Sequence, residues 1–318
     1  MLTVLKAGMM TSVQDGGRMG WQRFGVPVCG AMDPEALAIA NILCGNDETE
    51  AALELTGAGC AVRFESPNIF ALAGADFSPR LNGVPIETGR AVLAKKGDLL
   101  ETGFAKKGFR GVLAVAGGFD LPPVMGSRST DLKGGFGGFQ GRLLRDGDVL
   151  PFRDAQVWLP NLAERRAEML RSAADSPLRV VLGPQDDSFS QRGIQTFLSG
   201  TYTVTSKSDR MGYRLEGPKI EYAQDKDGNI ISDGIVMGAV QVPSGQPIIM
   251  MADRQTTGGY AKIAVVITPD LGRIAQMAAG HPLRFAAVTQ DEAEALTCAW
   301  KKDLRRLRET LDEETMLW

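Results

Sequence analysis

Glycine is the residue that most constrains this chain, because 38 of its 318 residues are glycine. Glycine adopts backbone conformations that turns and bulges need, and it weakens long helices. Typical turn sequences occur at Asn82-Gly83, at 96–98 and at 146–148, between short runs of β-forming residues. The pattern therefore predicts a mainly β protein with a few helices.

Short apolar runs with β-branched residues predict the strands. They are found at 60–64, 69–73, 91–94, 111–116, 178–182, 202–205, 248–252, 262–267 and 283–288. This periodicity is compatible with a barrel and equally with a sandwich.

Four segments carry helix signals. The clearest is 33–44, where Asp33 is a typical N-cap and Pro34 follows it. Weaker signals predict helices at 187–198 and 270–279. From 291 to 311, apolar residues recur every three or four positions, which predicts a C-terminal amphipathic helix with a solvated charged face.

The length favours two domains, because single cores stop growing near about 250 to 300 residues. We expect an N-terminal β domain over 1–158 with one helix near 33–44, followed by a helical connection over 159–177. A second β domain then covers 178–290, and the C-terminal helix covers 291–318.

Composition excludes several classes of function. The net charge of −3 gives no long-range attraction for polyanions, so nucleic acid is not an expected partner. No signal peptide or membrane-spanning run is recognisable, so a cytoplasmic protein without a membrane partner is expected. The four cysteines lack metal-binding or redox spacing, which predicts reduced, mostly buried thiols and no metal. The single histidine, His281, lies outside every polar segment, which argues against a catalytic triad.

Three polar islands stand out at 253–260, 208–214 and 11–18. The first is expected to be a loop that follows an apolar strand, where binding residues are often placed. All three combine carboxylates, guanidinium groups, amides and hydroxyls, so we expect them to form one site for a small, polar, anionic ligand.

The candidate site residues follow from these islands and from two further arginines. By chemical type, the catalytic candidates are Asp253, Asp209 and Arg210. The substrate-binding candidates are Gln14, Asp15, Arg18, Ser127, Arg128, Arg142, Arg254, Gln255, Thr256 and Thr257. For any single arginine, a structural ion pair is the alternative interpretation. The glycine-rich segment 134–141 either binds an anion through its N–H groups or is a structural connection with packed phenylalanines.

Six motifs in order also carry a family resemblance. They begin at Gln14-Asp15-Gly16-Gly17-Arg18, continue through 25–33, 124–130, 208–212 and 233–236, and end with the 253–260 island. This series resembles the allophanate hydrolase subunit 2 family, which includes the C subunits of 5-oxoprolinases, the KipA proteins and the C-terminal part of the urea carboxylase carboxyltransferase domain. The resemblance runs from about residue 10 to about residue 290.

The resemblance implies cyclophilin-like β-barrel domains and a site for a lactam or urea-like substrate. It implies the C subunit of an ATP-dependent 5-oxoprolinase, a hydrolase complex that opens 5-oxoproline to L-glutamate. The implied partners are the B subunit, which is KipI-like, and the A subunit, which is LamB/YcsF-like, and ATP is used by the complex. One alternative is a urea-type or allophanate-type carboxyltransferase subunit that receives biotin on another protein. Another is a KipA-like regulator that binds a KipI-like kinase inhibitor.

Overall fold

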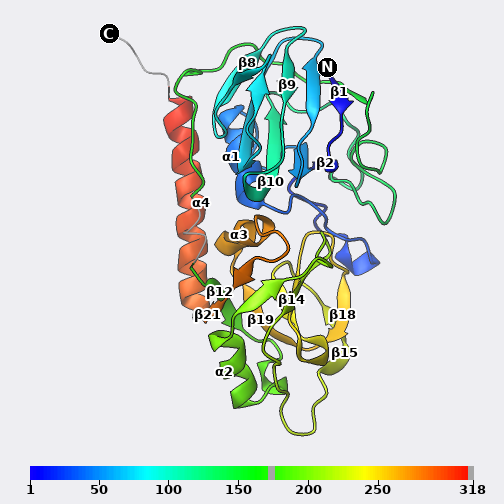
Figure 1. Cartoon of the computed structure of the whole chain (residues 1–318), viewed down its shortest axis with the longest axis vertical. Coiled ribbons are helices and arrows are strands. Elements are labelled where there is room, and N and C mark those ends of the chain that lie inside the picture. The colour runs from blue at the N-terminus through cyan, green and yellow to red at the C-terminus, as the bar shows by residue number, and fades with distance from the viewer. Residues whose placement is uncertain (171–175, 314–318) are drawn as a thin grey trace. The chain divides into compact units, whose positions relative to one another are not determined.

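The computed structural model describes residues 1–170 and 176–313, which form two compact units. Unit 1 comprises Met1–Met19, Cys29–Leu170 and Lys301–Trp318. Unit 2 comprises Gly20–Val28 and Arg171–Trp300. Both are built mainly from strands, so the predicted fold class is confirmed (Figure 1).

Unit 1 contains two antiparallel sheets. In spatial order, the first consists of β11 (Val149–Leu150), β1 (Leu2–Lys6), β4 (Ala61–Phe64), β9 (Leu99–Glu101), β6 (Arg80–Leu81) and β7 (Val84–Pro85). The second consists of β2 (Met10–Gln14), β3 (Ala52–Thr56), β10 (Lys107–Val115), β5 (Asn68–Asp76) and β8 (Ala91–Ala94).

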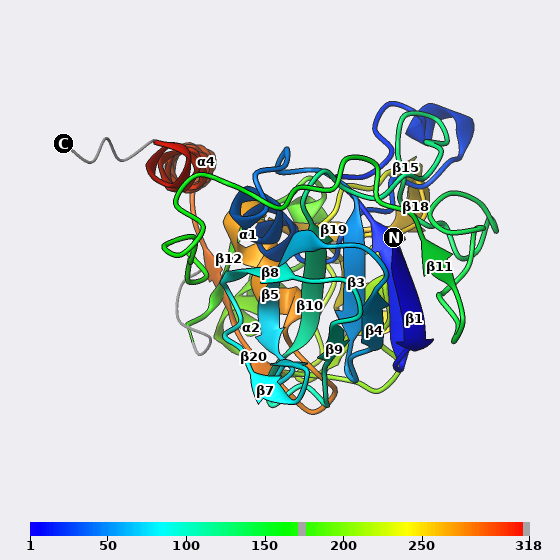
Figure 2. The same cartoon turned by 90° about the horizontal axis from the view of Figure 1, so that it is seen from above.

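The two sheets enclose one hydrophobic core. Val62 and Phe64 of β4 belong to the same buried cluster as Leu53 of β3 and Leu113 of β10. Helix α1 (Pro34–Leu43) packs on β5 and β10, as Figure 2 shows from above. Strand β5 is therefore buried over most of its length, since both faces of its sheet are covered.

Helix α1 confirms the clearest helix signal. The Asp33 carboxylate accepts a hydrogen bond from the Ala36 N–H at 3.0 Å, and Pro34 occupies the first helical turn. After the helix, Gly45 adopts a φ of 72°, a left-handed conformation that ends helices.

The main sheet of unit 2 has eight strands. Its order is β20 (Pro282–Leu283), β13 (Tyr202–Val204), β14 (Gly212–Glu216), β17 (Ile248–Met250), β16 (Ala239–Gln241), β19 (Lys262–Val266), β12 (Leu178–Leu182) and β21 (Phe285–Ala287). The two edge strands, β20 and β21, are separated in the chain only by Arg284. The edges must therefore lie side by side, and the sheet curls into a nearly closed barrel, as the family resemblance implied.

A separate two-stranded antiparallel ribbon in unit 2 pairs β15 (Asn229–Gly234) with β18 (Thr257–Tyr260). Two short helices, α2 (Gln191–Ser199) and α3 (Leu271–Ala275), also belong to this unit, each shorter than its predicted segment and each preceded by a 3₁₀ turn. The side chain of Ser190 caps α2 by accepting from the Gly193 N–H at 2.9 Å.

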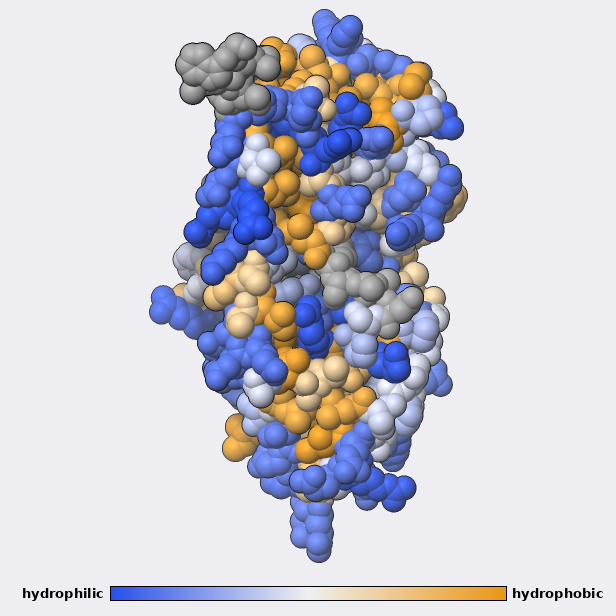
Figure 3. Space-filling view, turned by 90° about the vertical axis from the view of Figure 1, so that its left-hand side faces the viewer, coloured by the Kyte–Doolittle hydropathy of each residue, from blue (hydrophilic) through white to orange (hydrophobic). Residues whose placement is uncertain are grey.

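Helix α4 (Gln290–Asp312) matches the predicted C-terminal amphipathic helix. Leu304 and Leu311 are buried, whereas the lysines and most of the arginines are exposed. Hydrophilic residues cover much of the face drawn in Figure 3, on the side where α4 lies. No helix among the described residues is long and apolar enough to span a membrane.

The helical connection predicted for 159–177 is wrong for residues 159–170, and 171–175 lie outside the described residues. The segment forms turns and a bridge between Arg90 and Arg166 instead. Asn161 adopts a φ of 51°, which ends helical propagation, and the fully buried Arg165 donates hydrogen bonds to the carbonyls of Ile42 and Leu43. This buried side chain fixes the local path of the chain more strongly than helix propensity does.

The cysteines lie as expected, with Cys29, Cys44 and Cys60 buried and Cys298 exposed. Burial raises the pKa of the Cys60 thiol to about 12 and that of Cys44 further, so both are neutral packing residues. The described residues hold no group of three or more potential metal ligands.

Candidate functional sites in the two units

In unit 1, the carboxylate of Asp15 is the centre of a buried hydrogen-bond network. Asp15 follows β2 directly, and its oxygens accept from the hydroxyls of Ser127 and Ser129 at 2.7 and 2.5 Å. They also accept from the backbone N–H groups of Arg128 at 2.5 Å and Gly17 at 2.8 Å. Two motifs more than 100 residues apart in sequence are thereby joined around one carboxylate, and all four of these donors are uncharged.

Arg18 extends this network and is fully buried. Its Nε donates to the Val124 carbonyl at 3.0 Å, and its Nη2 donates to the Ser129 carbonyl at 2.8 Å. The guanidinium carbon lies 4.8 Å from the centroid of the Phe136 ring. Within the described residues Nη1 has no hydrogen-bond partner, and neither has Oε1 of the buried Gln14. Buried polar atoms are usually paired, so these two are candidate contacts for a ligand.

The glycine-rich segment 134–141 has a structural arrangement. The N–H groups of Gly135 and Phe136 donate to the Asp131 carbonyl, and that of Gly134 donates to the Asp131 carboxylate at 2.8 Å. Phe139 packs against the core of unit 1. Because these three N–H groups are engaged by Asp131, the interpretation as a structural connection is favoured over an anion-binding loop.

The two arginines proposed outside the islands have partners in unit 1. Arg142 forms a two-pronged ion pair with Asp148, with distances of 2.7 and 2.9 Å. Hydrogen bonding to the Arg142 guanidinium lowers the pKa of the Asp148 carboxyl. Arg128 donates from Nε to the Leu121 carbonyl at 2.7 Å and lies 3.6 Å from the Glu50 carboxylate. The alternative interpretation, a structural ion pair, therefore fits Arg142 well. A binding role for either arginine stays a prediction.

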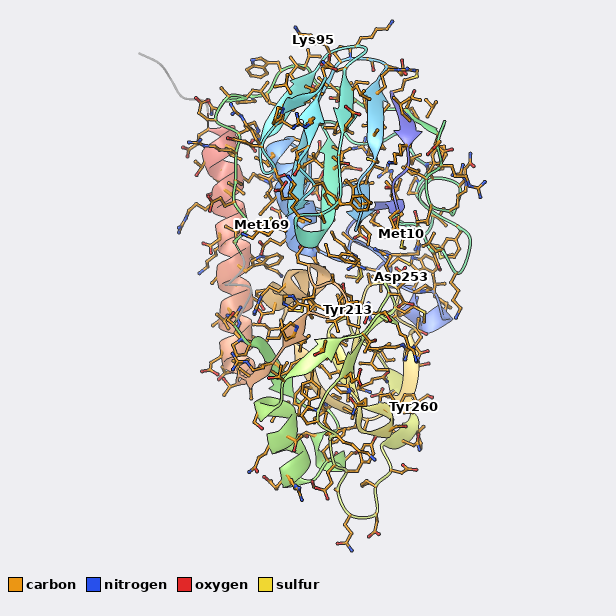
Figure 4. All side chains as sticks on the ribbon, viewed as in Figure 1. Met10, Lys95, Met169, Tyr213, Asp253 and Tyr260 are labelled. Carbon is orange, nitrogen blue, oxygen red and sulfur yellow. The ribbon has the colours of Figure 1, made fainter. Side chains whose placement is uncertain are left out.

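In unit 2, the buried Arg210 forms an ion pair with the half-buried Asp253. Nε and Nη2 of Arg210 donate to Oδ2 and Oδ1 of Asp253, both at 2.9 Å. Figure 4 labels Asp253 and Tyr213, the latter on β14, whose start follows Arg210. The side chain of Asp209 takes another direction and accepts from the N–H groups of Met211 and Gly212. The Asp209 carboxylate is thus engaged by the bend that precedes β14 and does not take part in the ion pair.

The remaining residues of the 253–260 island are only partly a loop. Thr257 begins β18 and pairs with Gly234, so the prediction of a loop throughout 253–260 is wrong for its second half. Arg254 is buried and donates from Nε to the Ile235 carbonyl at 3.1 Å. Gln255 and Thr257 are exposed and Thr256 is half-buried, so all three are at least partly accessible to solvent.

One polar group of unit 2 was missed in the sequence. Lys262 is 3% exposed, and its Nζ donates to Oδ2 of Asp233 at 3.3 Å. Gln241, its register partner in β16, is equally buried and donates to the Tyr260 carbonyl at 3.3 Å. The available signal was a lysine at the head of the otherwise apolar run 262–267.

A cavity of about 640 Å³ in unit 2 is lined by residues of β12, β19 and the first part of α4. Most of its lining is aliphatic, and none of the predicted site residues lines it. The predicted site residues therefore lie in the polar clusters and not at this cavity. That the three islands share a single site stays a prediction.

The chain is similar to known proteins along nearly its whole length. Residues 24–287 match the family model described as carboxyltransferase domain, subdomain A and B. The chain is 43% identical over 298 residues to the C subunit of 5-oxoprolinase from Escherichia coli, covering 92% of this chain and 93% of that protein. It is 38% identical over 319 residues to the C subunit of 5-oxoprolinase from Haemophilus influenzae, covering 99% and 100%.

Among solved structures, the urea carboxylase of Kluyveromyces lactis matches with a TM-score of 0.88 and 30% identity. That match covers 100% of this chain and 29% of the urea carboxylase chain, so this chain spans less than a third of its length.

Proposed function

Because the chain belongs to the family of carboxyltransferase domains built from subdomains A and B, we propose that it is the C subunit of a 5-oxoprolinase. The complex would use ATP to open 5-oxoproline to L-glutamate, and the partners would be a KipI-like B subunit together with a LamB/YcsF-like A subunit. One observation carries this choice within the family. The chain is 43% and 38% identical to the two 5-oxoprolinase C subunits, but 30% identical to the urea carboxylase.

The polar clusters supply the chemistry that such a substrate requires. 5-Oxoproline carries a carboxylate and a lactam, so it needs cationic or N–H donors for its oxygens and an acceptor for its ring N–H. We propose Arg18 and Gln14 in unit 1 as binding residues, because each has one buried polar atom without a partner among the described residues. In unit 2 we propose Gln255 and Thr257 as binding groups, because both are exposed and closely follow Asp253 in the sequence.

In unit 2, we propose Asp253 as the catalytic residue and Arg210 as the residue that positions it. Each oxygen of Asp253 accepts one bond from Arg210, and the carboxylate is only partly buried, with 15% of its side chain exposed. A carboxylate with free lone pairs can accept a proton from an attacking water. The role of Arg210 is then to hold that carboxylate in one orientation.

We assign the use of ATP to the complex as a whole. No dinucleotide or P-loop spacing occurs in the sequence, and the N–H groups of Gly134, Gly135 and Phe136 are engaged by Asp131. These residues do not fit a phosphate cradle, so no step of ATP chemistry is derived through them.

The test is release of glutamate and ADP from 5-oxoproline and ATP by the chain mixed with its cognate A and B subunits. Each protein is omitted in turn. Activity that disappears without this chain supports the proposal. An assembled mixture that is inactive on 5-oxoproline but carboxylates urea with a biotin carrier would replace it by the carboxyltransferase. If the chain binds the KipI-like protein but does not assemble with any A subunit, the result would favour a KipA-like regulatory protein over a 5-oxoprolinase subunit.

A further inference from the structure

Unit 2 contains a buried ammonium group that the roles proposed above do not use. Lys262 lies at the start of β19 and is 3% exposed. Lysine is almost never buried this deeply unless it is paired, because desolvation of its charge is costly. An ammonium has three donors, and the one that bonds Asp233 does so at the long distance of 3.3 Å.

The partner carboxylate lies at the surface. The side chain of Asp233 is 59% exposed and projects from β15, a strand whose residues are mostly exposed. Hydrogen bonding from the Gly234 N–H, and then from Lys262, lowers the pKa of Asp233, so its carboxylate is ionised at neutral pH. The pair therefore connects a buried donor with a solvent-accessible acceptor.

Amide groups surround the pair. The side-chain oxygen of Gln185 accepts from the backbone N–H of Lys262 at 3.2 Å, and Gln185 also contributes to lowering the pKa of Asp233. Gln241 is buried beside Lys262 in the register of β16 and β19. A Cβ atom built on Gly258 of β18 would lie 2.6 Å from Nε2 of Gln241, so this strand passes directly over the amide. Figure 4 marks the end of β18 with Tyr260.

We propose that Lys262 and Asp233 bind the cis-amide edge of the substrate, with Lys262 donating to the carbonyl oxygen and Asp233 accepting from the adjacent N–H. In a five-membered lactam the ring forces the amide into the cis form, so its C=O and N–H point to the same side. An ammonium beside a carboxylate presents a donor next to an acceptor, here 3.3 Å apart. The inference rests on the proposed function for the identity of the substrate, but the amide class follows from the pair itself.

This assignment makes Lys262 a binding group whose charge disfavours folding. Replacing a buried charge by an apolar residue of similar volume is often neutral or stabilising. If Lys262 only supported the fold, its replacement by an apolar residue would lower the stability of the protein.

The experiment uses Lys262→Met and Asp233→Asn, with Lys207→Met as the control, since Lys207 is an exposed lysine of the same unit. In the assembled complex, Lys262→Met is expected to lower kcat/KM for 5-oxoproline about 10- to 100-fold, the effect of losing one charged hydrogen bond to the substrate. The Tm of the isolated variant is expected to equal or exceed that of the wild type. Lys207→Met should change neither quantity.

Unchanged kcat/KM in both site variants would overturn the inference. So would a loss of activity in Lys262→Met together with a Tm lower by more than about 4 °C, because that pattern indicates a structural residue. Asp233→Asn keeps the test valid if Lys262→Met fails to fold, because the Asp233 side chain is largely exposed and its replacement should not prevent folding.

A binding measurement separates this inference from the proposed function. Saturation-transfer NMR on the isolated chain compares 2-pyrrolidinone, a lactam without a carboxylate, with proline, a carboxylate without an amide. If the wild type binds 2-pyrrolidinone and Lys262→Met does not, the amide site stands even when the complex fails to turn over 5-oxoproline. Binding of proline but not 2-pyrrolidinone, or of neither, overturns it.

Discussion

The guanidinium of Arg210 meets the carboxylate of Asp253 edge to edge, through Nε and Nη2, at two distances of 2.9 Å. The backbone is joined at the same place, because the Asp253 N–H donates to the Arg210 carbonyl at 2.9 Å. Two segments 43 residues apart are thus held by side chain and main chain together. This two-point geometry favours arginine, because a lysine cannot form both side-chain bonds.

Substitution of Asp253 by asparagine is expected to destabilise the protein by about 3–5 kcal/mol, because the buried guanidinium loses its counter-charge. Urea unfolding of the isolated chain measures the change. The matched control is Asp209→Asn, whose carboxylate faces a turn instead of Arg210. Equal stability of Asp253→Asn and wild type would show that the ion pair contributes nothing net.

Substitution of Asp15 by asparagine is expected to cost about 2 kcal/mol of stability, since hydrogen bonds to a charged acceptor contribute about 1.5–3 kcal/mol. An asparagine offers one oxygen where Asp15 uses two, and its NH₂ group would face the donors of Ser127 or Arg128. Thermal unfolding provides the measurement, with Asp47→Asn as an exposed loop control. A loss no larger than that of the control would contradict a central role for this carboxylate.

The Arg142–Asp148 pair predicts a pH dependence of stability. Its hydrogen bonds hold the pKa of Asp148 below the ordinary value of 3.8. A depressed folded-state pKa gives stability that is present above about pH 4 and is lost as the pH falls through the folded pKa. Wild type should therefore exceed Arg142→Met in free energy of unfolding at about pH 6, and the difference should shrink towards about pH 3. A difference that stays constant across this range would disprove the coupling.

Two glycines of the segment 134–141 form a matched pair for substitution by alanine. Both have a positive φ, 69° at Gly135 and 71° at Gly137. A Cβ at Gly135 meets open space, whereas one at Gly137 would lie 2.2 Å from the Ser129 carbonyl and 2.8 Å from Nη2 of Arg18. Gly135→Ala should cost only the left-handed strain of about 1–2 kcal/mol, and Gly137→Ala should cost more. Urea unfolding of the two variants side by side decides whether the segment must approach Ser129 this closely.

Local signals in the sequence predicted much of the fold. The runs 91–94 and 178–182 are strands β8 and β12 with the same bounds, because apolar β-forming residues end at turns. Strand β14 was hidden inside a polar island, since its glycine and arginine conceal the buried Tyr213 and Leu215. Strand β18 was missed for a similar reason, because Thr-Gly-Gly-Tyr has little apolar character.

The site was less predictable, because partners depend on tertiary contacts. Asp209 precedes Arg210 and Asp253 precedes Arg254 in the sequence, but the ion pair that forms joins Arg210 with Asp253. Lys262 escaped notice because a strand pattern reports which residues are apolar and does not report which polar residue turns inward.

Arg165 has a consequence for the order in which unit 1 can be completed during synthesis. Its guanidinium donates to carbonyls at the C-terminal end of α1, to the Leu311 carbonyl and to the Asp312 carboxylate near the end of α4. Unit 1 is interrupted in the chain by all of Arg171–Trp300. A ribosome must therefore translate unit 2 before the last partners of Arg165 emerge, and until then the nascent unit 1 carries a positive charge whose carboxylate partner is still unmade. The hydrogen bonds of Arg165 to Leu311 and Asp312 therefore form only after all of unit 2 has been synthesised.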